Sequence, residues 1–244
     1  MKLHVNTADL SKALKAVLPH ASDDPELPSL ACVQVHVTWE NLFLTATNRY
    51  TAGMASVSVW EREGLTGSQS DDFFTLSRDV VKEMLRFFRA KPKPENELDD
   101  QLCLEMTEKE FTVTDVSGLF PGKSVTWPDP QKVDNAPNLL RMFTSRLDRG
   151  LQVPARIITQ GKFLKLFAAA AQAYGHPITV EPSTSDRSLM LGCGESFLGM
   201  LMQVSLEGDS DLSTELNEWR DWWRRVLPGV AAALDGREDL EEAA

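Results

Sequence analysis

Residues 42–53 read Leu-Phe-Leu-Thr-Ala-Thr-Asn-Arg-Tyr-Thr-Ala-Gly, two β-type stretches on either side of a polar turn. Alternating apolar residues predict a strand over 42–47, and the β pattern resumes over 51–60. Upstream, residues 30–37 alternate well enough for another strand, with a turn at 40–41. A first strand at 3–5 and a helix that opens at Thr7 or Asp9 come before them. Residues 1–60 therefore predict one βαβββ unit.

The same order of elements recurs twice along the chain. Its second occurrence has a strand at 73–76, a helix at 78–90 capped by Ser77, and strands at 101–107, 111–115 and up to Trp127. A connector with a helical piece at 138–147 follows. The third unit is predicted as a strand at 156–159, a helix at 162–173, and strands at 178–181, 188–191 and 197–206. This order predicts an α+β fold in which antiparallel sheets carry their helices on one side.

Three units of this kind make one complete domain and one half domain. We expect the domain at 1–133, the connector at 134–150, the half domain at 151–206 and a tryptophan-containing helix with an acidic tail at 207–244. In that helix, residues 213–227, Leu216, Trp219, Trp223 and Val226 share one face, and Pro228-Gly229 is expected to end it. The helix either binds a partner or packs on the chain's own sheet; the size of the indole groups favours packing.

Composition excludes several classes of protein. The 244 residues are 42% hydrophobic and 25% charged, which is typical of a globular protein and not of a disordered one. No apolar run is long enough for a membrane span, and the N-terminus lacks the apolar block of a secretory signal. Cys32, Cys103 and Cys193 are odd in number and far apart. We therefore expect no disulfide framework, no metal and a cytoplasmic location.

No motif in the sequence indicates catalysis. Residues 118–124, Gly-Leu-Phe-Pro-Gly-Lys-Ser, resemble a phosphate-binding loop, but the first glycine is one residue too close and β-type residues follow. The four histidines have no metal-ligand spacing, and no serine occupies a nucleophile elbow. We expect no enzyme activity and no cofactor.

Basic residues line the predicted helices although the formal net charge of the chain is −11. Much of the acidity lies after residue 206, where there are eleven acidic residues and four arginines. Basic residues on helix faces attract phosphates without reading bases, so these helices predict non-specific contact with double-stranded DNA. The alternative is a solvated helix face, which Asp79 and Glu83 partly support. The candidate DNA-binding residues are Lys12, Lys15, Arg78, Lys82, Arg86, Arg89, Lys162 and Lys165.

Three stretches resemble one family, the bacterial sliding clamps (DNA polymerase III beta subunits). Residues 42–53 are similar to a strand-turn-strand of the family's middle domain, and residues 127–133 to the stretch that leaves that domain. Residues 197–206 are similar to its closing strand. The resemblance covers about residues 1–206 and implies a truncated clamp, because the first domain and half of the last have no counterpart. A ring of family size would need four copies.

The resemblance also implies what the protein binds. Family members form a ring around DNA, tether a polymerase and bind short peptides in an apolar pocket with three walls. It implies as partners double-stranded DNA, a DNA polymerase or other clamp-motif proteins and further copies of the chain, with no membrane and a place at the nucleoid. By position, the pocket residues would be Thr47, Arg49, Tyr50, Ala52, Pro128, Lys132, Val133, Met200, Leu201, Met202, Gln203 and Val204.

This sequence departs from the family pattern inside the implied pocket. Gln203 stands where the family has proline, Val204 where it has methionine, and Ala52 where it has leucine. Ala52 would make the pocket wider or shallower. A second hypothesis is therefore a non-ring interaction module, a decoy, adaptor or regulator of replication proteins that keeps only the peptide pocket. A third is an enzyme on an unrelated α+β scaffold.

Overall fold

The computed structural model describes residues 1–24, 26–65, 72–90, 99–128, 133, 136–147, 157–182, 188–204 and 210–241. It divides into two compact units, Met1–Gln203 and Val204–Ala244. Its elements are, in chain order, β1 (Lys2–Asn6), α1 (Thr7–Val17), η1 (Leu18–His20), β2 (Cys32–Val37), β3 (Asn41–Thr47), β4 (Thr51–Glu63), β5 (Phe73–Ser77), α2 (Arg78–Phe87), β6 (Gln101–Met106), β7 (Glu110–Asp115), β8 (Ser124–Pro128), α3 (Leu139–Leu147), α4 (Gly161–Leu164), η2 (Lys165–Phe167), α5 (Ala168–Tyr174), β9 (Ile178–Pro182), β10 (Ser188–Cys193), β11 (Phe197–Met202) and α6 (Ser210–Glu241).

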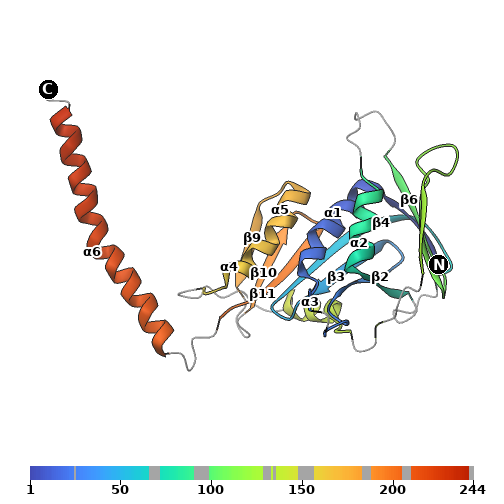
Figure 1. The fold of residues 1–244 in the computed structure, drawn as a ribbon, viewed down its shortest axis with the longest axis horizontal. Coiled ribbons are helices and arrows are strands. Elements are labelled where there is room, and N and C mark those ends of the chain that lie inside the picture. The colour runs from blue at the N-terminus through green and yellow to red at the C-terminus, as the bar shows by residue number, and fades with distance from the viewer. Residues whose placement is uncertain are drawn as a thin grey trace. The chain divides into compact units, whose positions relative to one another are not determined.

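The strands of the first unit form one antiparallel sheet in the order β5-β2-β3-β4-β1-β6-β7-β8 (Figure 1). Strand β4 is 13 residues long, so it can pair with strands from different repeats along its length. One end of β4 pairs with β1, while residues 51–55 pair with β11. Strands β10 and β9 continue outward from β11. The third repeat thus extends the sheet of the first, and the predicted α+β fold is confirmed.

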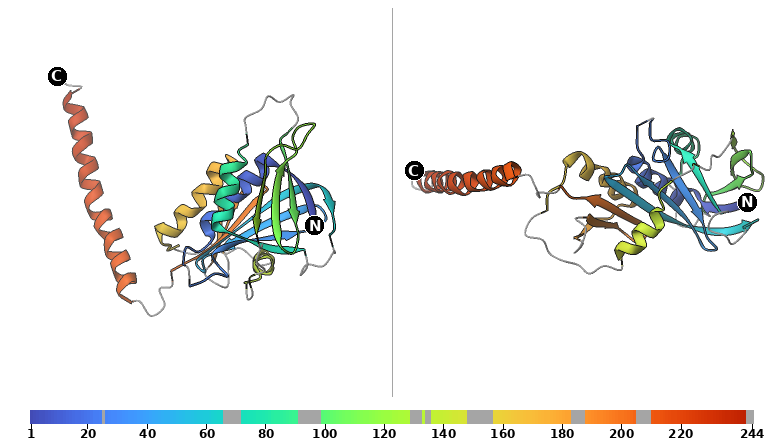
Figure 2. Two further views of the ribbon diagram at one scale, coloured as in Figure 1. Left: turned by 45° about the vertical axis from the view of Figure 1, so that its right-hand side comes forward. Right: turned by 90° about the horizontal axis from the view of Figure 1, so that it is seen from below.

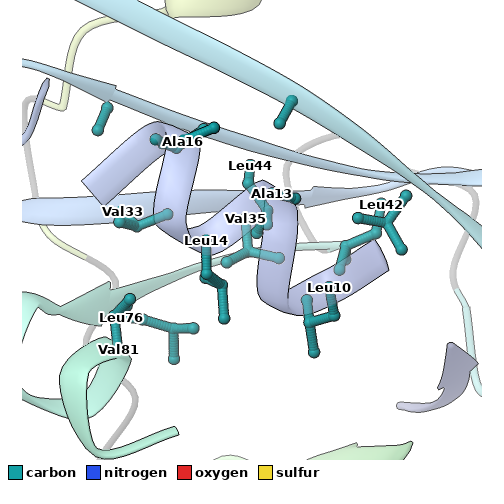
Figure 3. Packing of buried hydrophobic residues seen from close by; sticks show 14 of the residues in the cluster. Leu10, Ala13, Leu14, Ala16, Val33, Val35, Leu42, Leu44, Leu76 and Val81 are labelled. Carbon is teal, nitrogen blue, oxygen red and sulfur yellow. The ribbon is translucent and has the colours of Figure 1, made fainter. Parts of the chain in front are cut away.

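Helices α1, α2 and α5 cover one face of the sheet (Figures 1 and 2). Asn6 caps α1 by accepting from the backbone N–H groups of residues 8 and 9. Helical spacing then places one apolar stripe of α1 against β4 and β3. Figure 3 shows this inner core; the labelled residues are Leu10, Ala13, Leu14, Ala16, Val33, Val35, Leu42, Leu44, Leu76 and Val81.

Helix α3 lies on the opposite face of the sheet, next to β3 (Figure 2). The expectation of helices on one side therefore holds for the repeat helices, and the connector helix departs from it. Leu139 and Phe143 of α3 form a second, smaller core with residues of β4, β10 and β11. Helix α3 therefore covers part of the outer face of the sheet.

Several element boundaries differ from the sequence prediction. In the third repeat, residues 157–159 are not a strand, and residue 156 lies outside the described part. Helix α2 ends at Phe87, and β11 ends at Met202. Helix α6 continues past Pro228 and Gly229, so the predicted end at these two residues is wrong. Within the described residues, no helix is both long and apolar enough to cross a membrane.

Candidate functional site

The turn between β3 and β4 is built by its own side chains. Thr47 donates from Oγ1 to the carbonyl of Thr51 at 2.7 Å. Asn48 Oδ1 accepts from the backbone N–H groups of Tyr50 and Thr51 at 3.1 and 2.9 Å. Arg49 takes a positive φ of 76°, which closes the turn. The chain therefore presents residues 47–52 in a defined shape at the start of β4.

Two of the three predicted pocket stretches lie side by side at this turn. Ala52 is paired with Met200, and Thr51 with Leu201, in the β4–β11 register. The N–H of Met202 donates to the carbonyl of Tyr50 at 2.9 Å. Strand pairing therefore brings together segments that are about 150 residues apart in the sequence.

Alternation along β11 divides the predicted residues between two faces. Met200 points to the outer face and contacts Ala52, whereas Leu201 is fully buried in the inner core. Met202 is 41% exposed, while Gln203 and Val204 are half-buried. Leu201 is placed where it supports the sheet and does not line an outer surface.

Helix α3 covers the outer face at this junction. Phe143 is 1% exposed and Leu139 is fully buried, and both pack on Ala52 and Met200. The side chain of Gln34 donates from Nε2 to the carbonyl of Pro137 at 3.2 Å, which holds the segment that precedes the helix. Near the C-terminal end of α3, the guanidinium of Arg146 donates to Ser188 Oγ at 3.2 Å. The apolar surface predicted for a peptide is thus occupied by the chain itself.

The third predicted stretch lines a separate cavity. Pro128 and Val133 border a space of about 340 Å³ between the start of β2, the end of β5 and the end of β8. Lys132 lies outside the described residues. The other lining residues are Pro28, Ala31, Cys32, Thr75, Leu76, Ser77, Val80, Phe111 and Trp127. The described part of the chain therefore does not gather the three stretches into one open pocket.

Tyr50 lies against α4. Its ring stacks on Phe163 with 4.6 Å between centroids and 19° between planes. Lys162 Nζ lies 4.8 Å from the centroid of the same Phe163 ring. A residue predicted for the peptide surface and one predicted for DNA contact therefore share one aromatic neighbour.

Seven of the eight predicted DNA-binding residues lie on the helices of the repeats, and most are exposed; Arg89 lies just beyond the end of α2. Arg86 and Arg89 are exposed, and Arg86 also covers the Phe87 ring at 4.5 Å. Lys15 and Lys165 are exposed as well. Three are partly engaged within the protein: Lys12 pairs with Asp9 at 3.8 Å, Lys82 pairs with Asp79 at 2.8 Å, and Arg78 donates to the carbonyl of Ala21.

A buried histidine joins the first and third repeats. His20 is fully buried, its ring centroid lies 4.7 Å from that of Phe167, and its Nδ1 is 3.0 Å from Thr51 Oγ1. Thr51 Oγ1 donates to Asn48, so it accepts from Nδ1–H, which leaves Nε2 unprotonated. Nε2 has no hydrogen-bond partner among the described residues. Burial lowers the pKa of His20 to about 3, so the ring is neutral at physiological pH.

The strained turn residue gives a direct test of the turn geometry. Replacing Arg49 with glycine is expected to stabilise the protein by about 0.5–1 kcal/mol, because a positive φ costs a non-glycine residue roughly 1 kcal/mol or more. Urea unfolding measures the change. Arg49→Ala is the control, since it removes the guanidinium but keeps the strain; an equal gain in that variant would refute the explanation.

Sequence reasoning missed the residues that cover the outer face, Leu139 and Phe143. Their spacing of four residues on a predicted helix indicated a shared apolar face. It did not indicate that this face packs on the outer side of the sheet. Sequence reasoning also missed Cys32 and Leu76, which line the same cavity as Pro128 and Val133. In the described ranges, no group of three or more His, Cys, Asp or Glu side chains could hold a metal ion.

Solved structures provide the comparison with known proteins. The chain is similar to DNA polymerase III subunit beta from Borrelia burgdorferi (12% identity, TM-score 0.58) and from Thermotoga maritima (16%, 0.55). It is also similar to a DNA polymerase sliding clamp from Pseudomonas aeruginosa (14%, 0.54). Each match covers 84% of this chain and 64% of the solved one. No family model matches, and no curated protein matches. At these identities the similarity establishes the fold.

Proposed function

We propose that this chain, which has the sliding-clamp fold over 64% of a clamp's length, is a clamp-like protein without catalytic activity of its own. It contacts duplex DNA without sequence preference through its helix side, as a homo-oligomer. It also binds a short peptide of a DNA polymerase or another clamp-motif protein on its outer side. Such a role would place it at the nucleoid in the cytoplasm.

The observation that carries the DNA part is the charge of the helix side. Helices α1, α2 and α4 each have more basic than acidic residues, in a chain whose formal net charge is −11. Most of these basic side chains are exposed. Phosphate contacts depend on such charges and not on base-reading geometry, so this surface suits sequence-independent binding.

Reversing Arg86 and Arg89 to glutamate is expected to weaken binding to duplex DNA at least about tenfold at about 50 mM salt, because each lost phosphate contact removes a counterion-release term. Fluorescence anisotropy of a labelled duplex measures the affinity. The salt dependence should also become shallower, and two unrelated duplex sequences should give the same affinity.

The control for this experiment is a double reversal elsewhere, Arg62→Glu with Lys109→Glu. Both residues are exposed, on β4 and in the β6–β7 turn, and the change in net charge is identical. The control should bind DNA within about threefold of the unchanged chain. Equal affinity of all three proteins at low salt would contradict the DNA part of the proposal.

Two separate features support peptide binding. The cavity beside Pro128 and Val133 has room for one or two apolar side chains. The Ala52–Met200 surface is apolar and contains methionines, which adapt to varied ligands. Phe143 occupies that surface, so a partner peptide would have to displace α3 to reach it.

The alternative function is an interaction module that forms no ring. Its supporting observation is the short chain, which spans only 64% of the clamps it resembles. Native mass spectrometry separates the two. A stable monomer that still captures a clamp-motif peptide would favour the module, because one copy of this length does not encircle a duplex.

A further inference from the structure

Helix α6 has a heptad pattern that the clamp fold does not use. Its apolar residues alternate at spacings of four and three through Leu212, Leu216, Trp219, Trp223 and Val226. The sequence keeps this spacing to Val230 and Ala233. Seven consecutive positions at an average spacing of 3.5 residues are typical of a helix that winds around another helix in a coiled coil.

The seam of α6 is open to solvent. Trp219 and Trp223 are 55% and 52% exposed, and Trp222 beside them is 45% exposed. Exposed indoles along a helix stripe leave a large apolar area in water, which a partner helix would cover. Because exposing this apolar surface to water is unfavourable, burying it against another helix would lower the free energy.

Charged positions beside the seam indicate which partner fits. If Leu216 and Trp223 are taken as a positions and Trp219 and Val226 as d positions, Glu215 is a g position and Arg220 the following e position. In a parallel coiled coil, a g residue faces the e residue five positions later on the other helix. Two identical parallel helices would therefore form two Glu215–Arg220 pairs, one on each side of the seam.

The next pair of flanking positions agrees with this arrangement. Trp222 and Leu227 are the next g and e residues, so they meet as an apolar pair between the same two helices. Asp221 and Arg224, which pair within α6 at 3.8 Å, occupy f and b on the outside. Pro228 is also an f residue and faces away from the seam.

We propose that α6 binds α6 of a second copy of this chain as a parallel coiled coil, which makes the protein a dimer. This assigns a surface to the oligomer in the proposed function. The dimer proposal rests on the proposed function only through the homo-oligomer, since neither DNA nor a peptide takes part in the contact between the two α6 helices.

The test is the mass of the full-length protein by sedimentation equilibrium over about 1–100 µM, a range that brackets micromolar dissociation constants. We expect the mass of two chains. Glu215→Arg and Arg220→Glu should each weaken the dimer about tenfold or more, because each places like charges opposite one another on both sides of the seam.

Combining the substitutions makes the test specific to the parallel register. The double variant Glu215→Arg/Arg220→Glu should dimerise within about threefold of the unchanged chain, since its pairs are restored in reverse. An equimolar mixture of the two single variants should form a heterodimer. Circular dichroism checks that α6 remains helical in every variant.

Outward positions provide the matched controls. Glu218→Arg and Arg225→Glu make the same charge changes at c positions and should leave the dimer intact. A monomer at about 100 µM, any mass other than two chains, or a double variant that stays as weak as the singles would overturn the proposal. A monomer would also overturn the homo-oligomer of the proposed function, whereas an oligomer that the α6 variants leave unchanged would overturn this proposal alone.

Discussion

Replacing Phe143 with alanine is expected to release α3 from the outer face of the sheet. Phe143 is 1% exposed and packs on Ala52, Met190 and Met200. Truncating a buried phenylalanine costs about 3–5 kcal/mol, and Phe143 is one of only two buried side chains on this nine-residue helix. The loss should therefore appear as local undocking of α3 before the sheet unfolds.

Oxidation of two neighbouring methionines by peroxide measures this release. Met200 is 5% exposed beneath α3, whereas Met202, two residues later on the same strand, is 41% exposed. In the unchanged protein Met202 should oxidise much faster than Met200. In Phe143→Ala the rate at Met200 should rise toward that of Met202, as followed by peptide mass spectrometry.

The control is Met142→Ala on the exposed side of the same helix. It changes helix composition next to Phe143 but removes no buried contact, so Met200 should stay protected. Protection of Met200 in Phe143→Ala as well would show that the cover does not depend on this ring.

The same variant links the cover to peptide binding. If α3 and a clamp-interaction peptide compete for the Ala52–Met200 surface, the affinity measured in the unchanged chain is the intrinsic affinity multiplied by the small fraction of molecules in which α3 is undocked. Phe143→Ala should then bind such a peptide more tightly. Oxidation of Met200 without any gain in peptide affinity would refute the peptide site while leaving the packing of α3 established.

Acid is expected to destabilise the protein through His20. Burial lowers the pKa of His20 to about 3 in the folded protein, against about 6.5 when unfolded. Between these two values the unfolded chain binds one more proton than the folded chain at this residue. The contribution of neutral His20 to the free energy of unfolding is therefore fully present above pH 6.5. It is lost as the pH falls below this value, and the loss reaches about 4–5 kcal/mol at pH 3.

Urea unfolding at several pH values from 7 to 4 measures this loss. His20→Gln is neutral at every pH, so its stability should depend on pH less steeply, by up to about 1.4 kcal/mol per pH unit. His36, whose pKa burial lowers to about 4, contributes in the same direction in both proteins. His176→Gln, at an exposed histidine, should keep the original slope. An unchanged slope in His20→Gln would contradict the assigned state of His20.

Much of the sheet was predictable because its signals are local. The alternation in residues 42–47 and 51–60 specified β3 and β4, and helical spacing specified α1 and the connector helix α3. The prediction for the third repeat was less accurate. Its helix is divided into α4, η2 and α5, and no strand forms over 157–159. Tertiary contacts override weak local preferences in such short segments.

The candidate site was predictable in part. Residues 47–52 and 200–202 were expected to meet, and the β4–β11 pairing brings them together. The same alternation that made β11 recognisable turns Leu201 to the inner core and Met200 to the outer face. Pro128 and Val133 instead border the cavity near Cys32.

The repeat of strands and helices, the basic helix faces and the shared apolar face of Leu216, Trp219, Trp223 and Val226 were all predictable without coordinates, because periodicity and charge are properties of short stretches of chain. Three contacts were visible only in the folded chain: β11 adds to β4, His20 is buried against Phe167, and Phe143 covers Met200. These contacts join segments far apart along the chain. Their selection depends on which apolar surfaces fit each other once the sheet has curled, and no local pattern encodes that fit.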